Sequence, residues 1–386
     1  MMPSGNDGST TMRRATDLAL VVLFLVGITV PLIGLVGGID PNQIAGENRR
    51  LAAPPRLGPG GVRELRRQTD EWFDDHFGFR STLVATYGRI QFGLFGGGST
   101  RDVVVGRDGW LFYAREHTIE GHCGLLPPFT AAELTGWQQK IEQRRDWLAA
   151  RAIPYVLVIA PDKVTIYPEM LPPAWQSTFG PTRTDQVLAW MAAHSTVEII
   201  DLRPVLREAK ARDRVYHRTD SHWNDIGAFA GYRRIAAWLH PKFPPLRPLT
   251  PTDVRREETV GVAGDLAGLL AIVAYLREER IALVATTPSS CVPVALTPLM
   301  AAHERWYVEA YECPEAGVGR AVVIRDSFFD ALQPYFTGHF RRVVYVRHMF
   351  ASALIAAENP DVVVEEAIER VFTRTTDLLE SDLPGG

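Results

Sequence analysis

Two short polar segments carry the residue types needed for nucleophilic and acid–base chemistry. In the first, TDSHWN (219–224), Asp220 and His222 are separated by one residue. Side chains at positions i and i+2 of an extended segment point the same way, so both would face one cleft. A carboxylate beside an imidazole fixes its tautomer and stabilises the imidazolium that forms when the ring takes a proton from a serine. The spacing predicts a general base and its orienting partner.

Two other interpretations of the same segment stay open. The polar run TDSHWN also suits a turn that caps a helix beginning near residue 225. His217, Asp220 and His222 are also possible metal ligands, but they lack the helical H-x-x-x-H spacing of common zinc sites. We therefore expect no metal site here.

The second segment is Arg325-Asp326-Ser327, which follows the apolar run AVVI (321–324). A serine at a strand-to-helix junction projects its hydroxyl from a tight turn, and its backbone N–H at the helix start can stabilise an oxyanion. Ser327 is therefore a candidate nucleophile, although a capping serine beside a turn-forming Asp326 is the simpler interpretation of this tripeptide alone. No G-x-S-x-G surrounds Ser327 and no G-x-x-x-x-G-K occurs, so neither an α/β-hydrolase elbow nor an NTPase site is indicated.

Alternating strands and helices must position these residues. Apolar runs of strand length occur at 155–160, 197–200, 321–324, 343–346 and 361–364. Helical patterns occur at 131–150, 182–194, 203–211, 225–239, 328–337 and 365–373. This alternation predicts an α/β fold with a mainly parallel sheet between two layers of helices. Active sites of such sheets lie beyond the carboxyl ends of the strands, and the serine segment directly follows one strand.

The remaining segments predict smaller features around this sheet. Residues 102–113 predict two short strands joined by a turn, and residues 62–95 predict helix. Residues 241–320 are less regular, with strand-like pieces near 281–286 and 305–311, so we expect an irregular insertion there.

The N-terminal segment sets the expected compartment. Residues 18–39 are uncharged and long enough to span a membrane. Arg13 and Arg14 precede this segment and Asp40 follows it, so the positive-inside rule places residues 1–17 in the cytoplasm. A cleaved signal peptide is the rival interpretation, and we favour an uncleaved single-pass anchor in a bacterial inner membrane. Residues 40–100 then form a linker and helical stem, and residues 101–386 form a catalytic domain in the periplasm.

Composition narrows the remaining possibilities. A formal net charge of -4 gives no general case for nucleic-acid binding. Export permits disulfides, and we expect Cys291 and Cys313 to pair because they bracket a stretch that could form a hairpin. Cys123 is left over and is expected to be a small buried hydrophobe. No C-x-x-C occurs, so a redox or zinc-ribbon function has no support.

Several short blocks occur in a fixed order along the exported part. They are Glu47-Asn48-Arg49, EWFDDHFGFR (71–80), GRDGWLFY (106–113), APDKVTIYPE (160–169), TDSHWN (219–224), GDL (264–266), DSF (326–328) and PDVVVEEAIER (360–370). In this order they resemble the membrane-anchored periplasmic O-acetyltransferases of bacterial exopolysaccharide systems, of the alginate AlgJ/AlgX type. The resemblance implies an SGNH-hydrolase-like fold. It also implies a permuted arrangement, because in ordinary SGNH esterases the serine block precedes the Asp-His block.

The resemblance also implies roles for individual residues. Ser327 corresponds to the nucleophile, His222 to the general base and Asp220 to its orienting partner. The further candidates for substrate binding or oxyanion stabilisation are Lys163, Tyr167, Trp223, Asn224, Arg325 and Tyr335. Arg325 stands where many relatives of the wider superfamily have glycine, so it is expected to contact either substrate or a buried carboxylate.

The implied reaction is a two-step acyl transfer without a cofactor. The serine is acetylated, and a hydroxyl of an exopolysaccharide then removes the acetyl group. The implied acetyl donor is a multi-spanning membrane O-acyltransferase. Two other functions stay open: a periplasmic carbohydrate acetylesterase with the same triad, and a non-catalytic glycan-binding subunit. An anchor that tethers the domain near a membrane-bound donor favours the transferase.

Overall fold

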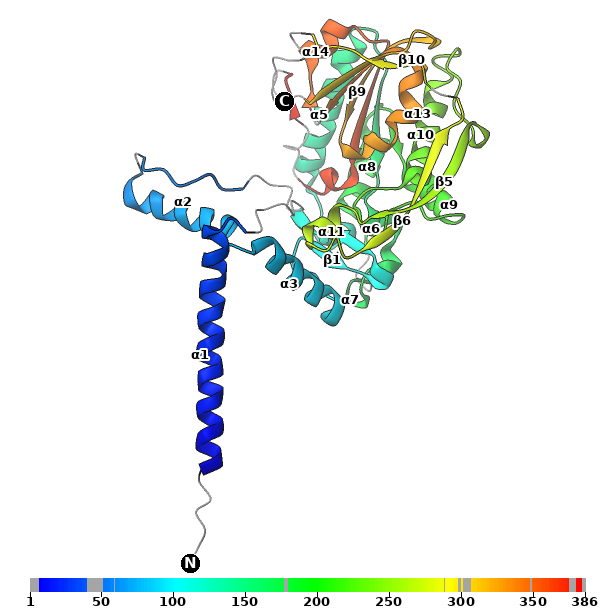
Figure 1. Ribbon diagram of the computed structural model, residues 1–386. Helices are drawn as coiled ribbons and strands as arrows, with labels where there is room; N and C mark the ends of the chain where they lie inside the picture. Colours follow the sequence, from blue (N-terminus) through cyan, green and yellow to red (C-terminus); the bar gives the residue numbers. More distant parts are fainter. Residues whose placement is uncertain are drawn as a thin grey trace, which may run out of the picture. The chain divides into compact units, whose positions relative to one another are not determined.

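The computed structural model describes residues 7–39, 51–58, 60–176, 180–287, 289–297, 300, 307–347, 349–374 and 380–383. The chain divides into two compact units, drawn in Figure 1. The first comprises residues 1–100 with 268–275, and the second comprises residues 101–267 with 276–386. The predicted catalytic residues all belong to the second unit.

The first unit is helical. It contains α1 (Asp7–Val36), α2 (Gly61–His76) and α3 (Arg80–Phe95). In α1, residues 13–36 form a helix long and apolar enough to cross a membrane, and its most apolar 18-residue stretch has a mean hydropathy of 2.8. This is compatible with the predicted anchor, although the helix ends three residues before the expected boundary at residue 39, because Gly37 and Gly38 form a turn.

The predicted helical stretch 62–95 is interrupted between α2 and α3. Phe79 adopts a left-handed conformation with φ of 60°, which ends the helical path. Gly78 donates its N–H to Pro31 O at 3.1 Å, and a Cβ atom on Gly78 would lie 2.5 Å from the Cα of Gly34. The two backbones approach so closely that only glycine fits at these positions.

The second unit is built on a seven-stranded sheet in the order β4-β3-β12-β9-β10-β8-β7. Its strands are β3 (Tyr155–Ala160), β4 (Ile199–Asp201), β7 (Val292–Pro293), β8 (Val308–Glu312), β9 (Val318–Arg325), β10 (Phe340–Arg347) and β12 (Val362–Ile368). The five strands from β4 to β10 are parallel, and β8 and β7 extend the sheet antiparallel. The predicted mainly parallel sheet is confirmed.

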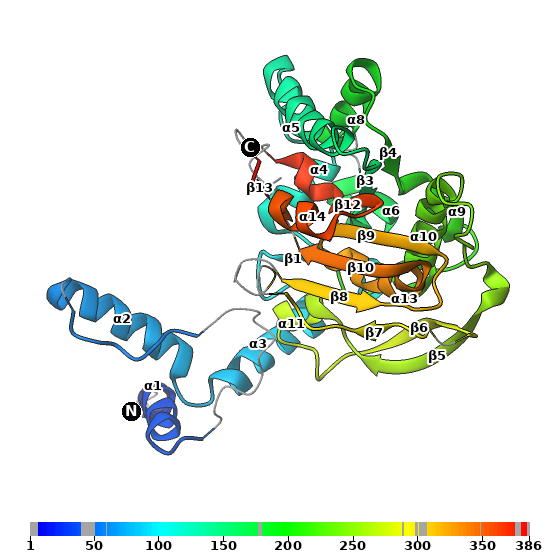
Figure 2. The ribbon, with the colours of Figure 1, turned by 90° about the horizontal axis from the view of Figure 1, so that it is seen from above.

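Helices cover both faces of this sheet (Figures 1 and 2). They are α5 (Ala131–Ala149), α8 (Arg183–His194) and α14 (Ser352–Glu358) on one face, and α9 (Arg203–Lys210), α10 (Asp225–Leu239) and α13 (Gln333–Phe336) on the other. Strand β3 shows why both layers form. Val156, Val158 and Ala160 pack into one buried apolar cluster, whereas Leu157 and Ile159 pack into the other. A strand buried on both faces must be continuously apolar, as this one is.

The smaller elements surround the sheet. They are β1 (Val103–Val105), β2 (Leu111–Tyr113), α4 (Thr118–His122), α6 (Lys163–Ile166), α7 (Pro173–Gln176), β5 (Val254–Val262), α11 (Asp265–Leu269), β6 (Arg277–Ala285), β11 (Met349–Phe350) and β13 (Glu380–Ser381). Short 3₁₀ helices occupy Arg107–Gly109, Arg115–His117, Pro168–Met170, Pro251–Asp253, Ser327–Ala331 (η5), Thr337–His339 and Glu369–Thr373. The predicted strand pair at 102–113 is confirmed as the antiparallel pair β1–β2.

Two helix predictions need correction. The predicted helix 365–373 is wrong, because β12 continues through Ile368 and only a 3₁₀ helix follows. Glu365 is buried in this strand, where Arg144 and Tyr155 bind its carboxylate, and this tertiary pairing outweighs the helical preference of glutamate. The predicted helix 328–337 is divided into η5 and α13.

Residues 241–320 contain more regular structure than their sequence indicates. They hold the antiparallel pair β5–β6 and supply β7 and β8 to the main sheet. A disulfide joins Cys291 and Cys313 beside the Val292–Glu312 pair of β7 and β8. Cys123 is buried in the core.

Candidate active site

Asp220, His222 and Ser327 form a continuous series of hydrogen bonds. His222 Nε2 lies 2.8 Å from Ser327 Oγ, and His222 Nδ1 lies 2.7 Å from Asp220 Oδ1. The same carboxylate oxygen accepts the backbone N–H of His222 at 3.0 Å. With Nδ1 protonated toward the carboxylate, Nε2 is an acceptor for the serine proton. The arrangement can therefore deprotonate a nucleophilic serine.

Ser327 lies where β9 ends and η5 begins. Asp326, rather than Ser327, caps η5, because its Oδ1 accepts the N–H of Phe328 at 2.7 Å. Its Oδ2 accepts the N–H of Ile368 at 2.7 Å, which ties the serine turn to the end of β12. The sequence interpretation in which Ser327 is the capping residue is therefore wrong. Its hydroxyl contacts His222 instead.

The loop that carries Asp220 and His222 is tied to both the serine turn and α10. Trp223 donates its indole N–H to Phe328 O at 3.0 Å, and its side chain is buried. Asn224 caps α10 by accepting the N–H groups of Ile226 and Gly227, and it donates to Arg214 O at 2.6 Å. Trp223 thus ties this loop to the serine turn, and Asn224 ties it to the start of α10.

Lys163 supports the same loop from the end of β3. Its buried ammonium group donates to His217 O at 3.0 Å, Arg218 O at 3.1 Å and Asp220 O at 2.6 Å. An ammonium has three N–H donors, so these three carbonyls use all of them. This geometry supports a positioning role for Lys163 rather than oxyanion stabilisation. Burial lowers the pKa of Lys163 to about 8.

The charges of Asp220 and His222 reinforce one another. Burial favours the neutral imidazole, but the hydrogen bond and the negative charge of Asp220 outweigh it and raise the pKa of His222. Asp265 and Asp326 act in the same direction with smaller effects. For Asp220, burial favours the neutral acid, yet the bonds from His222 lower the pKa of its carboxyl. The pair is therefore built to stabilise an imidazolium beside a carboxylate.

A second buried network of charges lies at the same edge of the sheet. Asp162, which follows β3, accepts the backbone N–H of Arg370 at 2.9 Å and lies 2.9 Å from His122 Nε2. The Arg370 guanidinium lies over the ring of Phe328, with its carbon 5.6 Å from the ring centroid. Burial raises the pKa of the Asp162 carboxyl, but the charge of Arg370 and the bond to His122 outweigh burial and lower it. This network joins the ends of β3 and β12 beside the serine turn.

Comparison with known proteins is consistent with this geometry. Residues 103–294 match the family model of the SGNH hydrolase-like domain of the acetyltransferase AlgX. Over these residues the chain is similar to proteins of the AlgJ/AlgX type. The probable alginate O-acetylase AlgJ of Pseudomonas putida is 28% identical over 173 residues, which are 45% of this chain and 43% of that protein. The corresponding protein of Azotobacter vinelandii is 27% identical over 173 residues, covering 45% of this chain and 42% of its own length.

The match spans less than half the length of these curated relatives. Among solved structures, Bacillus cereus PatB1 superposes with a TM-score of 0.53 and 16% identity over 72% of this chain and 98% of its own. This likeness shows the fold alone. The predicted SGNH-hydrolase-like α/β fold is confirmed, and its permuted order stays a prediction.

Two predicted binding residues, Tyr167 and Tyr335, lie in the core of this domain instead. Tyr167 accepts the N–H of Val215 at 2.9 Å with its hydroxyl oxygen, and its side chain is buried. Tyr335 donates to Leu283 O at 3.0 Å and is also buried. Their roles in the structure are to fix neighbouring backbone.

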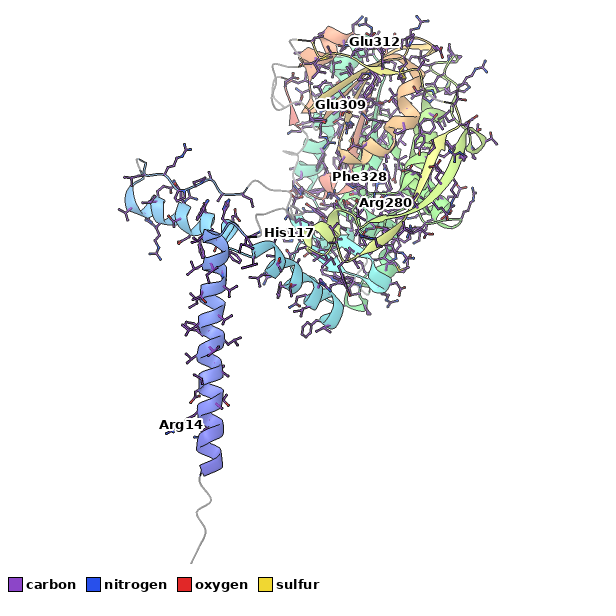
Figure 3. All side chains as sticks on the ribbon, in the orientation of Figure 1. Arg14, His117, Arg280, Glu309, Glu312 and Phe328 are labelled. Carbon is purple, nitrogen blue, oxygen red and sulfur yellow. A yellow bond between two sulfur atoms is a disulfide. The ribbon has the colours of Figure 1, made fainter. Side chains whose placement is uncertain are left out.

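Arg325 points its guanidinium at acidic side chains. It is 3% exposed and binds Glu309 Oε2 at 2.9 Å and the carboxylate of Asp330. Glu309, which Figure 3 labels, lies on β8. Of the two sequence-based expectations for Arg325, the contact with carboxylates describes its place in the structure.

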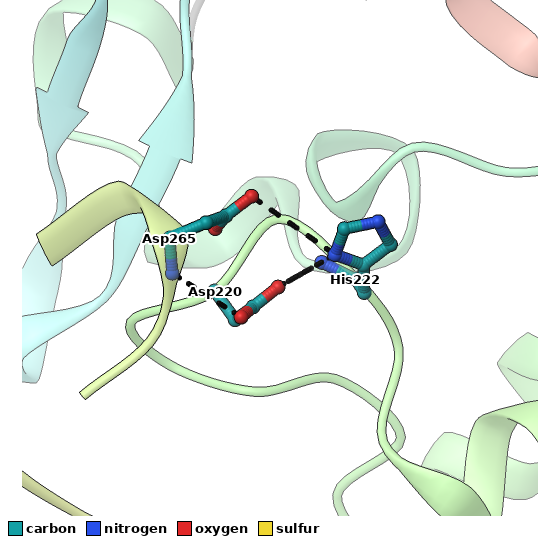
Figure 4. Close-up of side chains that lie close together, drawn as sticks. All are labelled: Asp220, His222 and Asp265. Atoms are coloured by element: carbon teal, nitrogen blue, oxygen red, sulfur yellow. Dashed lines mark hydrogen bonds and ion pairs between the residues drawn. The ribbon is translucent and has the colours of Figure 1, made fainter. Parts of the chain in front are cut away.

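Asp265 is the functional candidate that the residue types alone did not reveal. Figure 4 shows its carboxylate beside Asp220 and His222. Its neighbour Gly264 packs against Asp220, and a Cβ atom there would lie 2.3 Å from the Cβ of Asp220. In the sequence, the GDL block (264–266) is visible only through the family resemblance, and it lies in a stretch that is predicted to be irregular.

Asp220, His222 and Asp265 also offer ligand atoms within 4.8 Å of one another. A metal would need a ring nitrogen of His222. However, Nδ1 faces Asp220 and Nε2 faces Ser327, each at hydrogen-bonding distance. The geometry of this AlgJ/AlgX-type site therefore suits proton transfer better than metal binding.

Proposed function

We propose that this protein is an O-acetyltransferase that transfers acetyl groups to hydroxyls of a bacterial exopolysaccharide through a serine acyl-enzyme. The observation that carries the proposal is the hydrogen-bonded series from Asp220 through His222 to Ser327 in a domain of the AlgJ/AlgX type. The names of the matched relatives, probable alginate O-acetylases, support acetyl transfer to a polysaccharide.

In the first step Ser327 Oγ attacks the carbonyl carbon of the acetyl donor. His222 Nε2 takes the serine proton, and Asp220 stabilises the resulting imidazolium. The donor's leaving group departs with that proton, and the acetyl group stays on Oγ as an ester. The backbone N–H of Ser327 is the first of η5 and has no partner within that helix, which supports its assignment as an oxyanion donor.

In the second step a sugar hydroxyl enters where the leaving group stood. His222 takes its proton, the sugar oxygen attacks the acetyl carbonyl, and the ester to Ser327 breaks. The serine oxygen recovers the proton from His222, and an O-acetylated sugar leaves.

The N-terminal helix supports a location for this reaction. Residues 13–36 of α1 are compatible with a membrane anchor, and the arginines before the apolar run favour a cytoplasmic N-terminus. We place the catalytic unit in the periplasm, anchored to the inner membrane. The acetyl donor is then a multi-spanning membrane O-acyltransferase that delivers acetyl groups outward.

The test uses the full chain in detergent with an activated acetyl ester as donor and oligosaccharides, including alginate oligomers, as acceptors. We expect acetyl-Ser327 by peptide mass spectrometry and acetylated sugar by NMR. Ser327→Ala should abolish both products. Ser352→Ala on α14, outside the site, should leave both unchanged.

The products formed with the oligosaccharide acceptor distinguish between the competing functions. Release of acetate with no acetylated sugar would assign a carbohydrate acetylesterase. Equal turnover by the wild type and Ser327→Ala would overturn serine catalysis. Glycan binding without any acetyl-Ser327 would favour a non-catalytic subunit.

A further inference from the structure

Asp265 accepts two hydrogen bonds from Ser221, the residue between Asp220 and His222. Its Oδ1 accepts the backbone N–H of Ser221 at 2.7 Å, and its Oδ2 accepts the Ser221 hydroxyl at 2.6 Å. Two bonds from one carboxylate fix both the backbone and the side chain of Ser221. Ser221 stands between Asp220 and His222 in the chain. Its two hydrogen bonds to Asp265 therefore fix the backbone from which the side chains of Asp220 and His222 project.

Asp265 also binds Asp220 directly. The backbone N–H of Asp265 donates to Asp220 Oδ2 at 3.2 Å, while His222 occupies Asp220 Oδ1. Both oxygens of Asp220 are thereby engaged, so its carboxylate cannot rotate away from the imidazole without losing a bond. The close packing of Gly264 on Asp220 keeps this backbone N–H within reach.

The Asp265 carboxylate stands close to the imidazole as well. Its Oδ2 lies 4.0 Å from His222 Nδ1, and the Ser221 hydroxyl that it accepts lies 3.3 Å from the same nitrogen. The single proton of that hydroxyl goes to Asp265, so the hydroxyl does not donate to Nδ1, and Nδ1 keeps its own proton for Asp220. Asp265 thus adds a second negative charge on the side of the ring away from Ser327.

We propose that Asp265 is a positioning residue of this site, which fixes the Asp220–His222 pair through Ser221 and adds a second negative charge beside the imidazolium. The inference rests on the proposed function for its catalytic meaning, but its geometry is testable without turnover. The titratable groups that act on this pair are Asp265 and Asp326 on His222 and His217 on Asp220, with Lys163 on the carbonyl side of the loop.

The first measurement is the titration of the His222 ring by NMR in the full chain, with histidine labelled and the signal assigned by loss in His222→Gln. Asp265→Asn keeps the shape of the side chain but removes its charge. We expect the titration midpoint of His222 to fall by about one pH unit. Ser221→Ala keeps the charge of Asp265 and should leave the midpoint within a few tenths of a unit of wild type.

The second measurement is turnover of the acetyl ester. Both Asp265→Asn and Ser221→Ala should lower kcat by about tenfold with little change in KM, because each loosens groups that act in the transition state. The control is Glu312→Gln on β8, an exposed carboxylate well away from Phe328 in Figure 3. It should change neither the midpoint nor kcat.

An unchanged His222 midpoint in Asp265→Asn, with only a lower melting temperature, would overturn the proposal and leave Asp265 a structural residue. Failure of the proposed function would look different. Ser327→Ala would then turn over like wild type, while the His222 midpoint would still respond to Asp265→Asn. Should Asp265→Ala fail to fold, the near-isosteric Asp265→Asn still decides the question.

Discussion

Lys163 binds Asp220 through its backbone carbonyl and not through its carboxylate, with Nζ donating to Asp220 O at 2.6 Å. The carboxylate of Asp220 therefore stays available to His222, although a cation lies close by. The buried ammonium group of Lys163 thus holds three backbone carbonyls of this loop without binding the Asp220 carboxylate. The residue contributes geometry to the site instead of a competing ion pair.

Replacing Lys163 should destabilise this loop. Lys163→Met leaves three carbonyls without their donor, and we expect a loss of about 2 kcal/mol in the free energy of unfolding. We also expect kcat to fall by at least about tenfold, because His222 lies on the same loop. Chemical denaturation and ester turnover measure the two effects. Lys242→Met is the control, since Lys242 makes surface contacts with Glu198 and with the ring of Trp238, and stability close to wild type is expected there.

The pH dependence of turnover should report His222. A general base acts when deprotonated, and the pKa of His222 is raised above its ordinary value, so the acidic limb of kcat/KM should lie above pH 6.5. Asp220→Asn removes the main cause of the rise and moves the limb to lower pH. The same variant should lose about 10³–10⁴-fold in kcat, because the imidazole loses its tautomer. An acidic limb that stays in place in Asp220→Asn would contradict this assignment.

The free energy of unfolding should depend on pH through His222 and Asp220, and the direction follows from the shift of each pKa. Because the folded-state pKa of His222 is raised, its contribution is fully present below pH 6.5 and is lost as the pH rises through the folded value. For Asp220 the folded-state pKa is lowered, so its contribution is lost only in strong acid.

His339 should give the opposite dependence. Burial lowers the pKa of His339 to about 4, so between pH 6.5 and 4 the unfolded chain takes up a proton that the folded chain does not. We expect the free energy of unfolding to fall by about 2 kcal/mol between pH 7 and 5 from this residue. His339→Phe should flatten that slope.

The hydroxyl of Tyr232 provides the matched control for this effect. It lies 2.6 Å from His339 Nε2 and accepts the N–H of Leu249 at 2.7 Å. Tyr232→Phe should lower stability at every pH yet keep the slope, because burial and not the hydroxyl shifts the pKa of His339. Equal slopes in the wild type and His339→Phe would refute the explanation.

Gly264 should tolerate no side chain. A Cβ atom there would lie 2.3 Å from Asp220 Cβ and 2.5 Å from its Oδ2, so Gly264→Ala must displace the acidic partner of His222. We expect about a 100-fold loss of kcat, measured with the acetyl ester, since a small misplacement of a catalytic group costs this much. Gly261→Ala in β5 is the control, because the atoms it would meet belong to the flexible side chain of Arg280.

Much of the fold could be predicted because its strands are continuously apolar or bounded by turn residues. YVLVIA (155–160) and AVVI (321–324) predict buried strands, and the structure places both in the sheet. The spacing of Asp220 and His222 likewise predicts their contact, because it depends on adjacent residues alone. Ser327 needed the family resemblance, since a capping serine looks the same in sequence.

Other features depend on partners far along the chain and could not be predicted. Glu365 belongs to a run with helical composition, and it stays in a strand because Arg144 and Tyr155 bind it. Asp265 became visible only when the fold brought it 4.0 Å from His222. Lys163 could be placed after a strand, but its three carbonyl partners lie more than fifty residues away.

The order of strands has a consequence for how the protein is made. β12 lies between β3 and β9 in the sheet, yet it is the last of the seven strands to be synthesised. Until residues 362–368 leave the ribosome, β3 and β9 lack the strand that pairs with both of them, so the sheet stays divided in two parts. The sheet that carries the serine turn is therefore completed only after β12 has been synthesised.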